Sequence, residues 1–164
     1  MKDFGEFYVN FLIKEIERGN KSVRKCAIDS LILFLKKNHY LNKTNDIMKK
    51  TIDLFSTSAS FQGRLAFLEF YEACAENFSR QFFKAYNLNE LALNLAQDKV
   101  VEVRKKFLQN AVVLRKMIEN EDKGFLTRFE STLLKNITDQ NKTVSIVRVF
   151  EDINIMNLRW QKVH

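Results

Sequence analysis

The sequence predicts an all-α fold, an α-solenoid of about four antiparallel helical hairpins. Composition gives the first reason, because the 164 residues include 46% apolar residues, four glycines and no proline. So few turn-forming residues argue against a β-rich fold. The second reason is a turn that recurs, in which Arg24, Arg64 and Arg104 stand 40 residues apart. A period of about 40 residues built from two helices is typical of helical-repeat solenoids.

The recurring turn follows one plan, in which a helix-capping Asn or Asp precedes a lysine and then a valine that opens an apolar helix. The copies are Asn20-Lys21-Ser22-Val23-Arg24, Asp98-Lys99-Val100-Val101-Glu102-Val103-Arg104 and Asn141-Lys142-Thr143-Val144, with a weaker copy at Ser60-Phe61-Gln62-Gly63-Arg64. The four copies place one turn in each predicted hairpin.

The first hairpin is expected at about residues 3–38. Its first helix has one apolar face at helical spacing, and Gly19 should end it before Asn20 caps the second helix. That second helix continues the pattern with Val23, Ala27, Leu31, Phe34 and Leu35. The face expected to be buried in the first helix consists of Phe4, Phe7, Tyr8, Phe11, Leu12 and Ile16.

The second hairpin is expected at about residues 42–78. The polar run from Ser56 to Ser60 marks its turn, and its second helix is apolar around much of its circumference, as expected in the middle of a stack. The apolar positions of its two helices are Ile47, Thr51, Leu54 and Phe55, then Leu65, Phe67, Leu68, Phe70, Tyr71, Cys74 and Phe78.

The third hairpin is expected at about residues 79–119, with Ser79 and Asp98 as the caps of its helices and a bend at Asn87 or Asn89. The fourth, at about residues 122–157, begins near Asp122 and has its turn at Asn141. The apolar positions in these hairpins are Phe82, Phe83, Tyr86, Leu88, Leu91, Leu95, Val103, Phe107, Ala111, Leu114, Leu126, Phe129, Leu133, Ile137, Ile146, Phe150, Ile153 and Met156.

The whole chain, residues 1–164, is interpreted as one repeat domain. Ends of solenoids normally carry a polar outer face, but in this chain the first helix is rich in phenylalanine and the last reaches Trp160 without an evident cap. The alternative is therefore a fragment of a longer array, or an array that docks through its ends.

Cellular location is predicted from the absence of a signal peptide or transmembrane segment and from the cysteines. Cys26 and Cys74 are expected to be two buried free thiols in a reducing compartment. We expect the cytoplasm, with the nucleus as the alternative, and no association with a membrane.

The sequence contains few residues or motifs that are typical of a catalytic site. The two histidines, His39 and His164, stand in a predicted loop and at the last position, and no phosphate loop or metal-binding motif is present. We predict no enzymatic activity, no cofactor and no metal site.

Basic residues recur after each turn, in a chain with a net charge of +7. One interpretation is structural, since an arginine at this position can bond the acid of a neighbouring turn, such as Asp98. The other is a basic ridge that meets an acidic protein surface or a nucleic-acid backbone. The candidate binding residues are Lys21, Arg24, Lys25, Arg64, Lys99, Arg104, Lys105 and Lys142.

The turn from Asp98 to Arg104, with its 40-residue period, resembles the HEAT repeat, in which Asp and Val-Arg open the second helix of each hairpin. The resemblance covers nearly the whole chain and is clearest over residues 60–157. The proline common in the family's first helix is missing from this chain, and Gly63 stands where valine is expected.

Within HEAT proteins, the chain is similar to the scaffold subunits of type 2A-like phosphatases, especially the regulatory subunit 4 family of protein phosphatase 4. The residues that carry this likeness are Arg64-Leu65-Ala66-Phe67-Leu68, Cys74, Phe78-Ser79-Arg80-Gln81-Phe82-Phe83, Leu91 to Leu95 and Asp98 to Arg104. The resemblance implies that the turns within hairpins contact a phosphatase catalytic or regulatory subunit. These turns are Arg18 to Val23, Ser56 to Gln62, Gln97 to Val101 and Thr138 to Val144.

The function predicted from these observations is a non-catalytic scaffold that binds protein partners through its turns, in the setting of a phosphatase complex. Two alternatives stay open. One is binding of a nucleic-acid backbone by the basic ridge, and the other is a helical structural component of a large assembly.

Overall fold

The computed structural model describes residues 3–37, 43–119 and 123–139. Those residues form helices, turns and loops and no strand, which confirms the predicted all-α fold. The chain divides into two compact units, residues 1–88 and residues 89–164, and each unit is described by itself.

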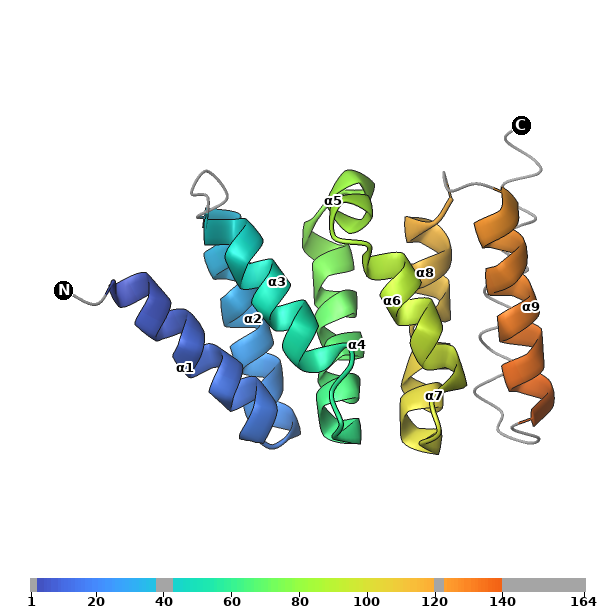
Figure 1. Cartoon of the computed structure of the whole chain (residues 1–164), viewed down its shortest axis with the longest axis horizontal. Coiled ribbons are helices and arrows are strands. Elements are labelled where there is room, and N and C mark those ends of the chain that lie inside the picture. The colour runs from blue at the N-terminus through green and yellow to red at the C-terminus, as the bar shows by residue number, and fades with distance from the viewer. Residues whose placement is uncertain (1–2, 38–42, 120–122, 140–164) are drawn as a thin grey trace. The chain divides into compact units, whose positions relative to one another are not determined.

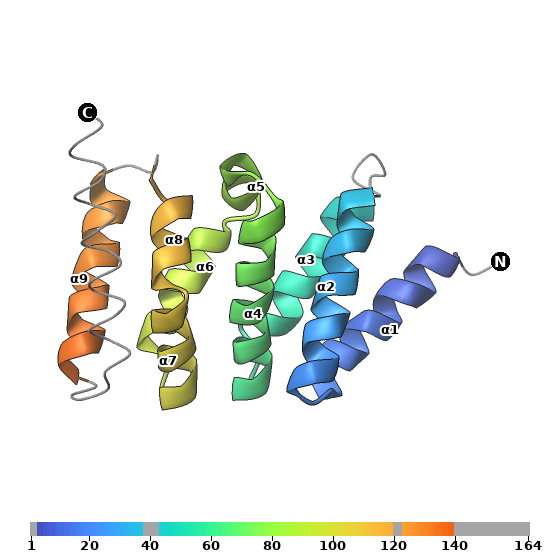
Figure 2. The ribbon, with the colours of Figure 1, turned by 180° about the vertical axis from the view of Figure 1, so that it is seen from behind.

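The first unit contains two consecutive helical hairpins, α1–α2 and α3–α4, followed by the short helix α5. Helices α1 and α3 form one layer and α2 and α4 the other, as the two opposite views show (Figures 1 and 2). This stacking of hairpins is the arrangement predicted for an α-solenoid. The helices are α1 Phe4–Arg18, α2 Lys21–Lys37, α3 Lys43–Phe55, α4 Phe61–Asn77 and α5 Arg80–Ala85.

Helix α4 is the centre of this unit. Its side chains are buried around most of its circumference, as predicted for an inner helix. The buried residues of α4 are Gly63, Arg64, Ala66, Phe67, Leu68, Phe70, Tyr71 and Cys74. Helices α2 and α3 pack against α4, Leu31 of α2, Met48 of α3 and Phe83 of α5 are fully buried, and the rings of Tyr71 and Phe83 meet edge to face at 5.0 Å.

Side-chain caps begin several of these helices where the sequence predicted them. The Asn20 side-chain oxygen accepts the N–H groups of Ser22 and Val23 at 3.1 and 3.0 Å. Ser60 and Ser79 cap α4 and α5 through their hydroxyl oxygens. Because the first N–H groups of a helix lack internal partners, such caps fix where each helix starts.

Equivalent positions of the two hairpins are joined across the first layer. Asp3 forms an ion pair with Lys43, and the Lys50 ammonium donates to the Asn10 side chain at 2.5 Å. The partners in both links are 40 residues apart, so the period read from the sequence is also the spacing of residues that touch. Two further links, Lys36 to Asn77 at 3.2 Å and Tyr86 to Asn45 at 2.5 Å, each span 41 residues.

The second unit begins at the second residue of α6 Leu88–Asn94. It continues with one turn of 3-10 helix at Leu95–Gln97, α7 Val101–Gln109, α8 Ala111–Met117 and α9 Lys123–Asp139. Its core contains the predicted apolar positions Val103, Phe107, Leu114, Phe129 and Leu133. The second helix of the predicted fourth hairpin lies outside the described residues.

Two asparagines interrupt predicted helices. Asn87 has φ of 53°, in the left-handed region that asparagine tolerates better than most residues. It separates α5 from α6, which confirms the bend predicted at Asn87 or Asn89. Asn110 separates α7 from α8, a break that the regular spacing of Val103, Phe107, Ala111 and Leu114 did not indicate.

Several predictions about burial and capping are wrong. Phe4, Phe7 and Phe11 are exposed, because α1 buries the opposite face, which consists of Val9, Leu12, Ile13 and Ile16. Val23 and Leu54, expected on buried faces, are also exposed.

Cys26 is exposed, whereas Cys74 is buried as predicted. Cys26 lies outside the buried face of α2, which is formed by Ala27, Ile28, Leu31, Ile32 and Leu35. Asp98 does not cap α7 directly: its carboxylate accepts the N–H of Val100 at 2.8 Å, and Val100 itself is the residue before the helix.

Candidate functional site

Basic residues lie beside the turns within hairpins in each unit, and we call these residues the turn ridge. In the first unit the turn ridge consists of Lys21, Arg24, Lys25 and Arg64, and in the second of Lys99, Arg104 and Lys105. The remaining predicted member, Lys142, lies outside the described residues.

Arg24 is held inside the first unit by an acid of the next hairpin. Its Nε lies 2.6 Å from one carboxylate oxygen of Glu69, and its Nη2 lies 3.0 Å from the other. Arg24 is only 8% exposed. Two parallel charge-assisted hydrogen bonds of this kind fix both side chains in one geometry, so the arginine joins α2 to α4.

Sequence reasoning missed Glu69 as the partner of Arg24. The two residues are 45 positions apart, and nothing local in the sequence indicates which residue of α4 faces α2. The only available signal was general, because an arginine on the buried side of a helix requires an acceptor.

Arg64 and Arg104 differ from Arg24, because each donates to the main chain of its own turn. The Arg64 Nη1 donates to the main-chain oxygens of Ser58 and Ala59, at 2.7 and 3.1 Å. The Arg104 Nη1 donates to the main-chain oxygen of Asp98 at 2.7 Å. In both turns an acceptor lies six residues before the arginine, so the side chain closes the turn that precedes its helix.

The sequence predicted a bond from such an arginine to an acid of a neighbouring turn, such as Asp98, and the contact observed at Asp98 comes from the arginine of its own turn. Arg104 does contact Asp98, but the acceptor is the peptide oxygen and not the carboxylate. A contact to the main chain depends on the shape of the turn and not on which side chain occupies it.

The lysines of the turn ridge are exposed, unlike Arg24 and Arg64. Lys21, Lys99 and Lys105 lie on the surface beside the turns. Lys25 is also exposed, and its ammonium lies 2.8 Å from the Asp29 carboxylate. Its hydrogen bond to Asp29, together with the charge of that group, raises the pKa of Lys25. The ridge thus combines fixed arginines with accessible lysines.

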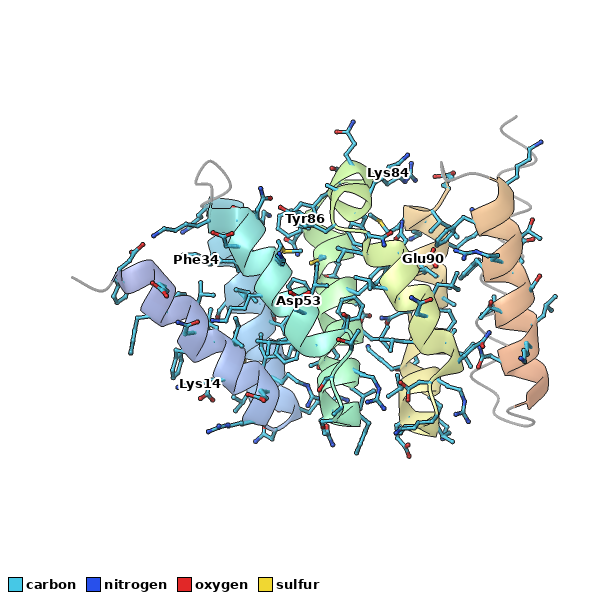
Figure 3. The ribbon with its side chains drawn as sticks, viewed as in Figure 1. Lys14, Phe34, Asp53, Lys84, Tyr86 and Glu90 are labelled. Carbon is cyan, nitrogen blue, oxygen red and sulfur yellow. The ribbon has the colours of Figure 1, made fainter. Side chains whose placement is uncertain are left out.

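A groove of about 600 Å³ lies between α1, α2 and α3 in the first unit. Phe4, Val9, Phe34 and Ile47 contribute its apolar lining, and Figure 3 labels Phe34 on α2. The two links Asp3–Lys43 and Asn10–Lys50 involve residues that line the same groove. The turn ridge contributes no residue to it.

A second, polar groove of about 390 Å³ lies between α6 and α9 in the second unit. Glu90, labelled in Figure 3, lines it and accepts a hydrogen bond from Arg128 at 2.5 Å. The guanidinium of Arg128 also lies 5.2 Å from the centre of the Phe125 ring. These contacts connect α9 to α6 within the unit.

The part of the chain that the structure describes has neither a metal-binding group nor a helix suited to spanning a membrane. It contains no group of three His, Cys, Asp or Glu side chains placed to hold a metal ion. Within the same residues, none of the helices has the length and apolar character needed to span a bilayer. His39 and His164 lie outside the described residues.

Comparison with curated proteins finds similarity to one kind of protein, serine/threonine-protein phosphatase 4 regulatory subunit 4. The human protein is 33% identical and the mouse protein 32% identical, each over 84 residues. The chain is related to these regulatory subunits. The matched segment is 51% of this chain and 10% of each relative, so the chain spans about a tenth of the length of the curated relatives it matches.

Two further comparisons found nothing. No family model matches the chain, and no solved structure matches it. The likeness to the HEAT repeat therefore stays a prediction, supported by the 40-residue spacing of the contacts in the first unit.

Proposed function

We propose that this chain is a non-catalytic helical scaffold that binds a protein partner through the exposed lysines of its turn ridge. The observation that carries the proposal is the different placement of the two kinds of basic residue. Arg24, Arg64 and Arg104 use their guanidinium groups within the chain, while Lys21 and Lys99 are exposed beside them.

This arrangement suits a binding surface for a physical reason. A turn closed by an internal arginine loses little conformational entropy when a partner docks, and a preorganised surface binds more tightly for that reason. The neighbouring lysines supply positive charge, which speeds association with an acidic surface and selects against basic ones. Affinity then depends on a few anchors along the ridge rather than on total contact area.

The proposed partner is the catalytic subunit of a serine/threonine phosphatase. Its support is the similarity over 84 residues to proteins named as regulatory subunits of phosphatase 4. A regulatory subunit acts by binding, and the proposal assigns this chain the same role, with the cytoplasm as the expected location.

A charge-reversal experiment tests the ridge. The triple substitution Lys21→Glu, Lys99→Glu, Lys105→Glu changes exposed ridge residues only, leaving the arginine contacts in place. The matched control is the triple substitution Lys49→Glu, Lys84→Glu, Lys135→Glu, at exposed lysines away from the turns. Each triple lowers the net charge from +7 to +1, since every change removes two units.

The readout is affinity capture from a cell lysate, with nuclease treatment and identification of captured proteins by mass spectrometry. We expect the wild-type chain and the control triple to capture a phosphatase catalytic subunit after nuclease treatment, and the ridge triple to lose it. Equal capture by both triples would show that the ridge is not the binding surface. Capture only of proteins that disappear with nuclease would favour the nucleic-acid alternative.

The nucleic-acid alternative has its own test, because binding to phosphates weakens steeply with salt. Affinity for a DNA duplex should fall by orders of magnitude between low and moderate salt if the lysines neutralise several phosphates. An affinity for the duplex that does not change with salt would exclude this alternative.

A further inference from the structure

The outer face of α1 is aromatic, where a helix at a protein surface is normally polar. Phe4, Phe7 and Phe11 are 78%, 66% and 50% exposed, and their i, i+3 and i+7 spacing places them in one row. At about 100° per residue, this row lies on the side of the helix opposite its buried residues. A helix that is apolar on two opposite sides is typical of one packed on both.

The exposed aromatic area is substantial. A phenylalanine offers roughly 200 Å², so the three exposed fractions together leave about 400 Å² of aromatic surface in contact with water. That is as large as the largest apolar patch of an average monomer, which is often functional. Burial of this surface by a partner is therefore favourable.

The same row continues with cations toward the end of the helix. Lys14 and Arg18 follow Phe11 at i+3 and i+7, and both are exposed. Lys14 lies on the side of α1 that faces away from α2 and α3 (Figure 3). Glu15 and Glu17 flank these cations on either side of the row. The α1 stripe, namely Phe4, Phe7, Phe11, Lys14 and Arg18, is thus aromatic in its first half and cationic in its second.

We propose that the α1 stripe docks against the same stripe of a second copy of this chain, with the two α1 helices antiparallel. A two-fold axis near Phe11 brings Phe11 of the two copies together. It also places Lys14 and Arg18 of one copy over the aromatic half of the other, where cations are attracted to ring faces. Every such contact occurs twice in a two-fold interface.

Charge decides between the two orientations of the pair. A parallel pair would bring Lys14 and Arg18 against their own copies, which is repulsive. In the antiparallel pair, these cations instead lie over the phenylalanine rings of the other copy. The stripe is therefore complementary to itself in one orientation only.

The area predicts a weak, reversible dimer. Two stripes together contribute about 800 Å² of aromatic surface, below the roughly 1,200–2,000 Å² that stable interfaces bury. Association should therefore depend on concentration over the accessible range. It should also weaken at high salt, because part of it comes from exposed charges.

The test is the mass of the full chain by sedimentation equilibrium over about three decades of concentration. We expect the mass to rise from 19.4 kDa toward twice that value. The double variant Phe7→Glu, Phe11→Glu should stay monomeric at every concentration. Leu33→Glu is the matched control, because it removes an apolar side chain of α2 that is 53% exposed and lies outside the stripe, and it should still dimerise.

A second variant tests the cationic half of the stripe. Lys14→Glu, Arg18→Glu should raise the dissociation constant at least tenfold, because it places carboxylates over the ring faces. All substituted side chains are exposed, so circular dichroism should show unchanged helix content in each variant.

Three results would overturn the proposal. The first is a wild-type chain whose mass stays at 19.4 kDa at every concentration. Another protein or another segment of the chain would then be what covers the α1 stripe. The second is a dimer that persists in Phe7→Glu, Phe11→Glu. The third is a dimer that Leu33→Glu removes equally, since the association would then be a general effect of exposed apolar residues.

Discussion

The ion pair between Arg24 and Glu69 should contribute far more to stability than a surface salt bridge. The two side chains are 10% and 21% exposed, with N–O distances of 2.6 and 3.0 Å. Exposed pairs contribute about 0–1 kcal/mol, whereas one hydrogen bond to a charged group contributes about 1.5–3 kcal/mol. Arg24→Met keeps the apolar stem but leaves the Glu69 carboxylate without its arginine in a largely buried place. We expect this variant to lose about 2–3 kcal/mol of unfolding free energy.

The assay is a double-mutant cycle measured by urea unfolding and by thermal melting. For a chain of this length, the expected loss corresponds to a drop in Tm of about 4–12 °C. Glu69→Leu should cost a similar amount, because it leaves the Arg24 guanidinium unpaired. The double variant should cost about as much as one single variant and not the sum of the two, since an apolar pair has no uncompensated charge. We therefore expect a coupling free energy of about 2 kcal/mol.

The control is Lys25→Met, which removes the exposed pair with Asp29 on the same helix. It should leave the Tm unchanged within error, because solvent screens both partners. A coupling below about 0.5 kcal/mol between Arg24 and Glu69 would refute the reasoning.

Two further predictions concern the first unit. Gly63→Ala should destabilise the chain by about 1–3 kcal/mol in urea unfolding, because its Cβ would lie 2.4 Å from the Ser58 hydroxyl oxygen. In Gly5→Ala the new Cβ would lie 3.4 Å from the Phe34 ring, an ordinary van der Waals contact, so this variant should be neutral or stabilising. A loss equal to that of Gly63→Ala would contradict the steric explanation. In the native state a thiol reagent should label exposed Cys26 rapidly and spare Cys74, because burial raises the pKa of the Cys74 thiol well above its usual value and also blocks access. Labelling of both thiols at one rate without denaturant would show that α4 opens readily.

Local signals in the sequence predicted the helix boundaries well. Asn20, Ser60 and Ser79 begin helices as expected, because a cap depends on residues two or three positions away. Asp98 shows the limit of such reasoning. Its carboxylate also accepts the N–H two residues on, but α7 starts at Val101, two residues later than a cap at Asp98 would place it.

Faces were harder to predict than boundaries. In α1 the periodic phenylalanines gave a stronger pattern than the residues that are actually buried, since both sides of the helix are apolar. Periodicity identifies an apolar face, but it does not indicate which of two such faces meets the core. Cys26 was misplaced for a related reason, because its neighbour Ala27 is the buried residue.

The sequence predicted the positions of the candidate site residues but not their bonding partners. The 40-residue spacing identified Arg24, Arg64 and Arg104 as equivalent, but not what they bond. Arg64 and Arg104 close their own turns, whereas Arg24 reaches Glu69 in the next hairpin. Such a choice depends on the three-dimensional shape of each turn, which a residue pattern does not contain.

The links between Asp3 and Lys43 and between Asn10 and Lys50 have a consequence for how such a chain can change length. A single residue added inside a helix rotates everything after it by about 100° and turns one partner of a link away from the other. Duplication of a whole 40-residue block instead returns each donor and acceptor to a facing position. Growth by copying complete blocks is therefore the change in length that these contacts tolerate, and a synthetic duplication of residues 21–60 is a direct way to add a hairpin to this sequence.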